Sequence, residues 1–128
     1  MPDNREYIKE WFEKGNHDFI TAKLAFETGV ITDTTVVLLQ QAVEKYLKGY
    51  LISKGWRLKK THDLVELIDA AAKYNSVFKD HINLADQLTA LYLQERYPTV
   101  PSTDYPREEI ASLIEQTATL ITLIKKTK

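Results

Sequence analysis

The residues best suited to chemistry form a short polar stripe inside a largely apolar stretch. Gln41, Glu44, Lys45 and Lys48 follow one another at steps of three, one and three residues, so a helix would gather them on one side. Two ammonium groups beside an amide could bind a phosphate through charge-assisted hydrogen bonds. Glu44 and Lys48 could instead form a solvated ion pair worth about 0.2–0.5 kcal/mol. Asp18, at the border of another apolar face, could pair with Lys45 or Lys48.

A histidine downstream of this stripe is the second candidate. His62 follows Thr61, which we predict to be the N-cap of a short helix. The dipole at a helix start disfavours a protonated imidazole, and the exposed backbone N–H groups there favour an anion. His62 could therefore contact a phosphate or transfer a proton. It could equally pack on the second helix and hydrogen-bond to Asp18 or a backbone carbonyl, with Asp63 beside it complementing the helix dipole.

Two arginines complete the candidates. Arg96 lies just before Tyr97 and Pro98, where it could clamp a phosphate through two hydrogen bonds or only end a helix and cover the core. Arg57 precedes the pair at 59–60, Lys-Lys, and the three form a basic cluster that we expect to be a solvated loop.

Several classes of site are not expected. The chain has no Cys, which excludes disulfides and thiolate chemistry. His17 and His81 lack a second ligand at a suitable spacing, so we expect no metal and no other cofactor. The four Gly residues are scattered and form no phosphate-binding loop. Because the formal net charge is -1, an anionic ligand would have to find a local basic patch.

The elements that must position these residues are helices. Apolar residues recur at three- and four-residue steps throughout. The predicted helices span Tyr7–Phe26, a start at Thr32 or Asp33 to Lys54, His62–Tyr74, Val77–Glu95 and Pro106–Lys126. Asp3 is a predicted N-cap, while Gly29 and Gly55 are predicted stops. The stretch Pro98–Tyr105, with two prolines, cannot be helix interior.

The predicted fold is all-α: an antiparallel up-and-down helical bundle of four main helices plus one short helix, in a single domain over residues 1–128. In the fourth helix the predicted inward residues are Val77, His81, Leu84, Ala85, Leu88, Leu91 and Tyr92. No apolar run approaches the roughly 18–20 residues of a membrane span. The N-terminal residues lack the layout of a signal peptide, so we expect a cytoplasmic, prokaryotic-type protein.

The second predicted helix is apolar on more than one side. Its core face contains Val36, Leu39, Val43, Tyr46, Leu47 and Tyr50. A further side carries the small residues Ala42 and Gly49. A helix of this kind is central in a bundle or lies at an interface. Because small residues admit close approach, we expect a homodimer whose interface includes this side.

Two stretches carry a resemblance to a known family. They are residues 40–52, QQAVEKYLKGYLI, and, after Gly55, residues 61–64, THDL. Together they resemble the signature of the HEPN domain family, the nucleotide-binding domain of higher eukaryotes and prokaryotes. Further matches are Trp11, Asp18-Phe19, Ala22 and Arg96-Tyr97-Pro98, while Gly15 stands where the family usually has Ala. The resemblance covers about residues 5 to 125.

The resemblance implies a helical bundle, frequent homodimerisation, and partnership with a separately encoded minimal nucleotidyltransferase, often as a toxin–antitoxin pair. Some members resemble metal-independent ribonucleases that use Arg, four to six residues, then His. Arg57 and His62 have that spacing. However, the family motif lies at the final major helices with a polar residue after the Arg, where this sequence has Leu58. Arg96 is better placed, but no His follows it within range.

Three functions follow from these observations. The leading hypothesis is a non-catalytic module that binds nucleotide or RNA phosphate through Gln41, Lys45, Lys48, His62 and Arg96. The first alternative is a metal-independent endoribonuclease, with His62 as the acid–base group and Arg57 or Arg96 stabilising phosphate. The second is a homodimeric scaffold that binds no nucleotide.

Overall fold

Helices account for all the regular structure that the computed structural model describes, namely residues 4–29, 33–96 and 105–127. The helices are α1 (Asn4–Thr28), α2 (Asp33–Ser53), α3 (Leu64–Ala72), α4 (Ile82–Arg96) and α5 (Arg107–Thr127), with the 3₁₀ segment η1 (Ser76–His81) before α4. No strand occurs within these ranges. The prediction of an all-α bundle is confirmed.

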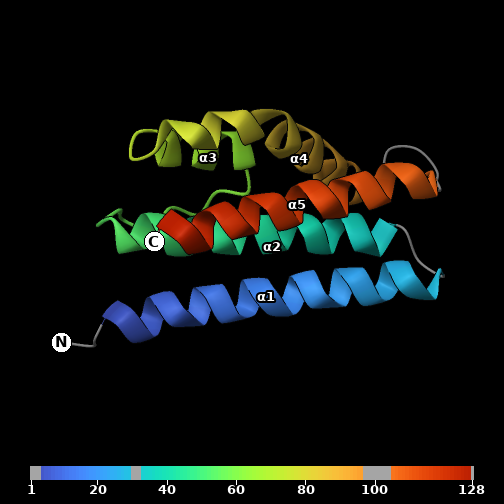
Figure 1. Cartoon of the computed structure of the whole chain (residues 1–128), viewed down its shortest axis with the longest axis horizontal. Helices are drawn as coiled ribbons and strands as arrows, with labels where there is room; N and C mark the ends of the chain where they lie inside the picture. Colours follow the sequence, from blue (N-terminus) through green and yellow to red (C-terminus); the bar gives the residue numbers. More distant parts are fainter. Residues whose placement is uncertain (1–3, 30–32, 97–104, 128) are drawn as a thin grey trace.

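The central helix of the bundle is α2, which packs against each of the other four α-helices. In Figure 1, α1 lies on one side of α2 and the α3–α4 pair on the other, while α5 runs along α2. Following the colours, α1 and α4 run in one direction, and α2 and α5 run in the opposite direction. This is the up-and-down arrangement that the short connections predicted, with α3 and η1 inserted between the second and third long helices.

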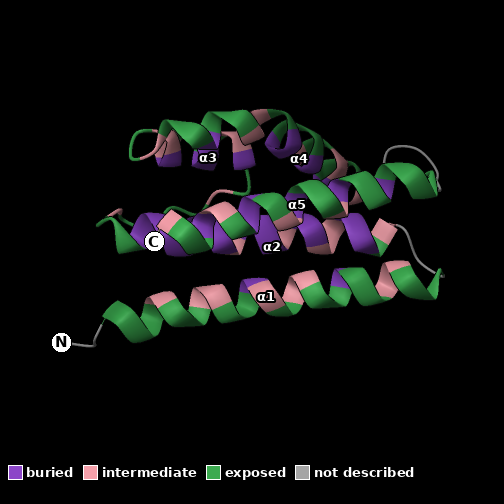
Figure 2. Ribbon diagram, viewed as in Figure 1, coloured by how far each residue is buried: buried purple, intermediate pink, exposed green. Residues whose placement is uncertain are grey.

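Burial follows this arrangement. Fourteen residues of α2 are buried, against two of α1, although α1 is the longer helix. Figure 2 shows the same contrast between an almost continuously buried α2 and a largely exposed α1. The six residues of the predicted core face of α2 are all buried. The buried polar residues of α2, namely Thr35, Gln40, Glu44 and Lys48, must therefore find partners inside the protein.

Two glycines let α1 lie directly on α2. A Cβ on Gly49 would lie 2.9 Å from a ring carbon of Phe12, and a Cβ on Gly15 would lie 2.8 Å from the ring of Tyr46. The side of α2 that carries Ala42 and Gly49 is therefore covered by α1 of the same chain. The expectation that a second copy packs on this side was wrong, because small residues permit close approach whichever helix supplies the partner.

The connection between α2 and α3 corrects one predicted cap. The residue at the N-cap of α3 is Asp63, whose side chain accepts a hydrogen bond from the N–H of Val65. Thr61, the predicted cap, lies two residues too early: its Oγ1 accepts from the N–H of Asp63 and donates to Glu66. The predicted stops at Gly29 and Gly55 are confirmed, since both glycines have positive φ, +71° and +89°.

The predicted fourth helix is divided into two segments. Asn75 caps η1 by accepting from the N–H of Val77, and the α-helix begins only at Ile82. A 3₁₀ segment has three residues per turn, so it turns a different set of side chains inward. Val77, predicted to face the core, is 46% exposed, whereas Phe78 is fully buried.

Some expectations fall outside the described residues, namely those for Asp3, Thr32 and the stretch from Pro98 to Asp104. Among the described helices, none combines the length and the apolar character that crossing a membrane would require.

The contact between α1 and α2 yields a prediction with a definite sign. In an open helix interior, Gly→Ala stabilises by about 1 kcal/mol. At Gly49 the new methyl group would meet Phe12 and, at 3.2 Å, the Cβ of Trp11, so we expect Gly49→Ala to destabilise the protein by about 1–3 kcal/mol. Urea denaturation measures the change. An increase in stability would show that α1 is not packed closely on α2.

Candidate functional site

Along its central part, α2 reaches the surface in one narrow strip. Between Thr35 and Ile52, the only residues of α2 that are not buried are Val37, Leu38, Gln41 and Lys45. Val37, Gln41 and Lys45 are spaced four residues apart and form one line along the helix. The predicted polar stripe is thus divided by depth: Gln41 and Lys45 lie at the surface, whereas the side chains of Glu44 and Lys48 are only 7% and 6% exposed.

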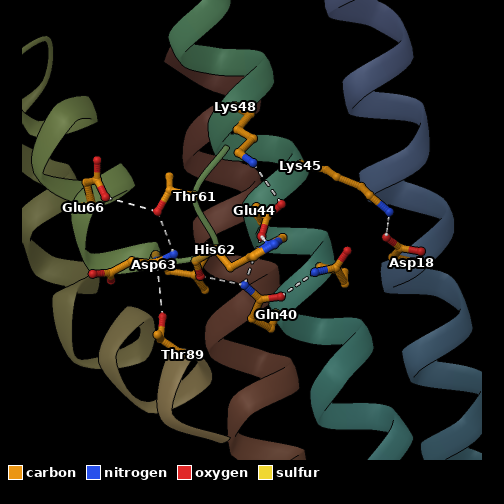
Figure 3. Close-up of polar contacts among 12 residues, drawn as sticks. Asp18, Gln40, Glu44, Lys45, Lys48, Thr61, His62, Asp63, Glu66 and Thr89 are labelled. Carbon is orange, nitrogen blue, oxygen red and sulfur yellow. Dashed lines mark hydrogen bonds and ion pairs between the residues drawn. The ribbon is translucent and has the colours of Figure 1, made fainter. Parts of the chain in front are cut away.

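The buried Glu44 carboxylate accepts hydrogen bonds from three side chains (Figure 3). Its Oε2 accepts from Lys48 Nζ at 3.1 Å. Its Oε1 lies 3.2 Å from Gln40 Nε2 and 2.8 Å from His62 Nδ1. The idea of a solvated Glu44–Lys48 pair was wrong, because α1 and the connection before α3 cover these side chains. Lys48 Nζ also lies 5.9 Å from the ring centroid of Trp11 on α1.

This contact fixes the orientation of His62. An ionised carboxylate can only accept, so the ring nitrogen that faces Glu44, Nδ1, must carry the proton. In the neutral ring, Nε2 is then the unprotonated nitrogen. The His62 side chain remains 59% exposed, so one edge of the ring is anchored in the protein and the rest reaches solvent. Hydrogen bonding to Asp18, proposed from the sequence, is replaced by hydrogen bonding to Glu44.

Gln40 was not among the predicted site residues, yet it holds the same segment. It is fully buried, and its Nε2 donates to the backbone oxygen of His62 at 3.0 Å. Its Oε1 accepts from Gln41 Nε2 at 2.7 Å. Farther along, the N–H of Leu64 donates to Thr89 Oγ1 at 3.1 Å, which ties the start of α3 to α4. Spacing could have identified Gln40, since it lies four residues before Glu44.

His62 and Arg96 both contact the ring of Tyr92 on α4. The His62 and Tyr92 rings lie 5.6 Å apart between centroids, with an interplanar angle of 39°. The Arg96 guanidinium carbon lies 5.6 Å from the centroid of the same Tyr92 ring. Tyr92 is buried, as predicted, whereas Arg96 is exposed. Two predicted candidates from distant parts of the sequence therefore contact one aromatic ring.

A hydrogen bond from Tyr105, which lies just before α5, fixes the end of α4 that carries Arg96. Tyr105 donates from its hydroxyl to Glu95 Oε1 at 2.5 Å. Burial, followed by this hydrogen bond and the charges of nearby carboxylates, raises the pKa of Tyr105 well above its ordinary value. Tyr105 therefore stays protonated and remains a donor to Glu95, which fixes the last turn of α4.

The remaining candidates lie elsewhere. Lys45 forms an ion pair with Asp18 and reaches toward α1, on the side of α2 away from the α3 connection (Figure 3). The predicted pairing of Asp18 is confirmed. Arg57 is exposed in the non-helical connection before α3. Lys59 is also exposed, and its Nζ forms an ion pair with Glu66 Oε1 at 3.6 Å.

The other two histidines are not part of this arrangement. His17 is exposed on α1, as predicted. His81 is half-buried at the end of η1, where burial lowers its pKa. Across the described residues, no group of three or more His, Cys, Asp or Glu side chains is placed to hold a metal ion.

Comparisons with known proteins agree with this architecture. The model of the HEPN domain family matches residues 8–127. The crystal structure of TT1696 from Thermus thermophilus is similar with a TM-score of 0.82 at 21% identity, over 94% of this chain and 98% of that one. The crystal structure of ST0689, an archaeal HEPN homologue, is similar with a TM-score of 0.74 at 22% identity, over 93% and 95%. At these identities the likeness shows a shared fold. No curated protein matches the chain.

The chain offers a matched test of the buried Glu44. Glu10 and Lys14 form an ion pair with the same spacing and the same 3.1 Å distance as Glu44 and Lys48, but both side chains are 60% exposed. Glu44→Gln leaves the Lys48 ammonium buried without a counter-charge, so we expect a loss of about 3 kcal/mol. Glu10→Gln should change stability by less than about 0.5 kcal/mol. Urea denaturation gives the free energy of unfolding of both variants. Equal losses would contradict the conclusion that Glu44 is a buried counter-charge to Lys48.

Proposed function

Because the chain belongs to the HEPN domain family, we propose that it binds the phosphate groups of a nucleotide or RNA at the surface formed by His62 and Arg96, which both contact the buried Tyr92 ring. The observation that carries this proposal is the convergence of His62 and Arg96 on one tyrosine ring. A guanidinium group is the side chain best suited to contact two oxygens of one phosphate.

Local charge supports binding of an anion here. The Glu44 carboxylate, which would otherwise repel a phosphate, is neutralised by Lys48 within the protein. Arg96 then contributes a positive charge that the described contacts leave facing an aromatic ring rather than a carboxylate. Lys48 thus serves the site by compensating Glu44, while Gln41 and Lys45 extend the polar surface along the exposed strip of α2.

One observation also favours the enzymatic alternative. A carboxylate that holds Nδ1–H of a histidine leaves Nε2 able to accept a proton, which is the orientation that general base catalysis requires. With Arg96 against the same Tyr92 ring, His62 could act on an RNA 2′-hydroxyl without a metal. Cleavage of RNA in the presence of EDTA by the natural protein, and its loss in His62→Ala, would establish this activity. If the natural protein cleaves no RNA, the enzymatic alternative is excluded and only the binding proposal remains.

The proposal extends to partners. We propose a homodimer that works in the cytoplasm with a separately encoded minimal nucleotidyltransferase, as family membership suggests. The exposed face of α1 carries Ile20 and Leu24, at 47% and 56% exposure, and apolar side chains of this kind favour association. Sedimentation at high micromolar concentration should show a dimer. A monomer would count against this part of the proposal.

Arg96 gives the sharpest test of phosphate binding. We expect Arg96→Ala to weaken nucleoside monophosphate binding by about 1–3 kcal/mol, since it removes charge-assisted hydrogen bonds. Arg96→Lys should recover only part of this loss, because an ammonium cannot contact two oxygens in the fixed fork of a guanidinium. Calorimetric titration gives the affinities, which should also fall with added salt.

The control for this test is Lys79→Ala. Lys79 is exposed on η1, which precedes α4, whereas Arg96 is the last residue of α4, so removal of Lys79 should leave the affinity unchanged. Because Arg96 is also exposed, neither variant should unfold more readily. Equal loss of binding in Lys79→Ala would show that the interaction depends on overall charge alone. If the natural protein binds no nucleotide or RNA and Arg96→Ala only lowers its stability, the proposal is refuted.

A further inference from the structure

The connection that carries His62 also carries two adjacent lysines. It is non-helical over residues 56–63, and both Lys59 and Lys60 are exposed on it. The Nζ of Lys59 forms an ion pair with Glu66 on α3. Lys60 has no such pair with any carboxylate in the part of the chain that the structure describes. One uncompensated ammonium group therefore lies two residues before the histidine of the proposed phosphate site.

Contacts of the neighbouring residues indicate the side to which Lys60 points. The side chains of Lys59 and Thr61 both contact the Glu66 carboxylate on α3. His62 points away from Glu66, toward the buried carboxylate of α2 (Figure 3). In an extended segment, successive side chains point to opposite sides, and residues two apart share a side. Lys60 therefore lies on the same side of the connection as His62.

The spacing of these groups suits more than one phosphate. The Cα atoms of Lys60 and His62 lie at most about 7 Å apart, since each residue spans no more than about 3.6 Å. The His62 ring contacts the same tyrosine ring as the Arg96 guanidinium. A phosphate between Arg96 and His62 would leave the Lys60 ammonium unused. The next phosphate of a strand lies one nucleotide farther along, within reach of this flexible side chain.

The carboxylates close to Lys60 in the sequence do not oppose an anion there. Glu66 is compensated by Lys59. Asp63 accepts a hydrogen bond from a backbone N–H at the start of α3, where the helix dipole offsets its charge. An ammonium group binds a phosphate as a point charge and needs no fixed direction of approach. Lys60 is thus suited to the backbone of a strand whatever its bases.

We propose that Lys60 binds the phosphate next to the one held by His62 and Arg96, so that the ligand is a strand of linked nucleotides rather than a mononucleotide. This inference rests on the proposed function, since it extends the same site by one phosphate. Because contacts to phosphates carry no sequence information, binding through these residues depends little on the base sequence.

The test compares a ligand that has one phosphate with a ligand that has two. They are 2′-O-methyluridine 5′-monophosphate and the 5′-phosphorylated dinucleotide of the same unit, in which the methyl groups prevent cleavage through the 2′-oxygen. We expect the natural protein to bind the dinucleotide at least about fivefold more tightly, because a charge-assisted hydrogen bond is added. Lys60→Ala should abolish this difference and leave the affinity for the monophosphate unchanged. Calorimetric titration gives the affinities.

Lys59→Ala is the matched control, because Lys59 is the neighbouring exposed lysine with the same charge but pairs with Glu66 on the other side. It should keep the full preference for the dinucleotide. The Lys60 position is refuted, while phosphate binding stands, if the natural protein binds both ligands equally well, if the preference survives Lys60→Ala, or if both lysine variants lose it alike. If neither ligand binds the natural protein, the proposed function fails, and the Lys60 position fails with it.

Discussion

The rest of this structure depends on one buried carboxylate. Glu44 lies on the central helix, with a side chain only 7% exposed, and a charge at that depth must be compensated from within the protein. Lys48, from the same helix, provides the opposite charge, while Gln40 and His62 provide the remaining hydrogen bonds. Gln40, Glu44 and Lys48 are spaced four residues apart, so α2 brings them together without help from other elements. His62 is the one partner that must come from elsewhere in the chain.

That requirement connects stability to function. The connection before α3 has to follow a path that places His62 against Glu44, and Gln40 fixes the backbone there through the His62 oxygen. Asp63 then caps α3, whose position is tied to α4 through Thr89. As a result, the His62 ring lies beside Tyr92, and the Arg96 guanidinium faces the same tyrosine ring. The groups that could meet a phosphate are thus placed by a buried polar network rather than by a mobile loop.

The sequence predicted the helices and the core because the spacing of apolar residues indicates which face of each helix is buried. It did not predict which element packs against that face. Ala42 and Gly49 indicated a close neighbour, but the neighbour is α1 and not a second copy. Spacing also placed Glu44 and Lys48 together without revealing that both are buried. Val77, which was predicted to face the core, is exposed, and Phe78 is buried in its place, because a 3₁₀ segment has a different period from an α-helix. The contact of His62 with Tyr92 arises from tertiary packing that no local pattern contains.

In the proposed anion site, Glu44 holds His62 against the Tyr92 ring that Arg96 also contacts. The most direct measurement is a titration with inorganic phosphate followed by NMR of the His62 ring and the arginine side-chain N–H groups. We expect the His62 and Arg96 signals to shift together along one saturable curve, while the signal of Arg107, which contacts Phe26 from the start of α5, should not shift. Shifts of His62 without Arg96, or shifts spread over all the arginines, would contradict this site.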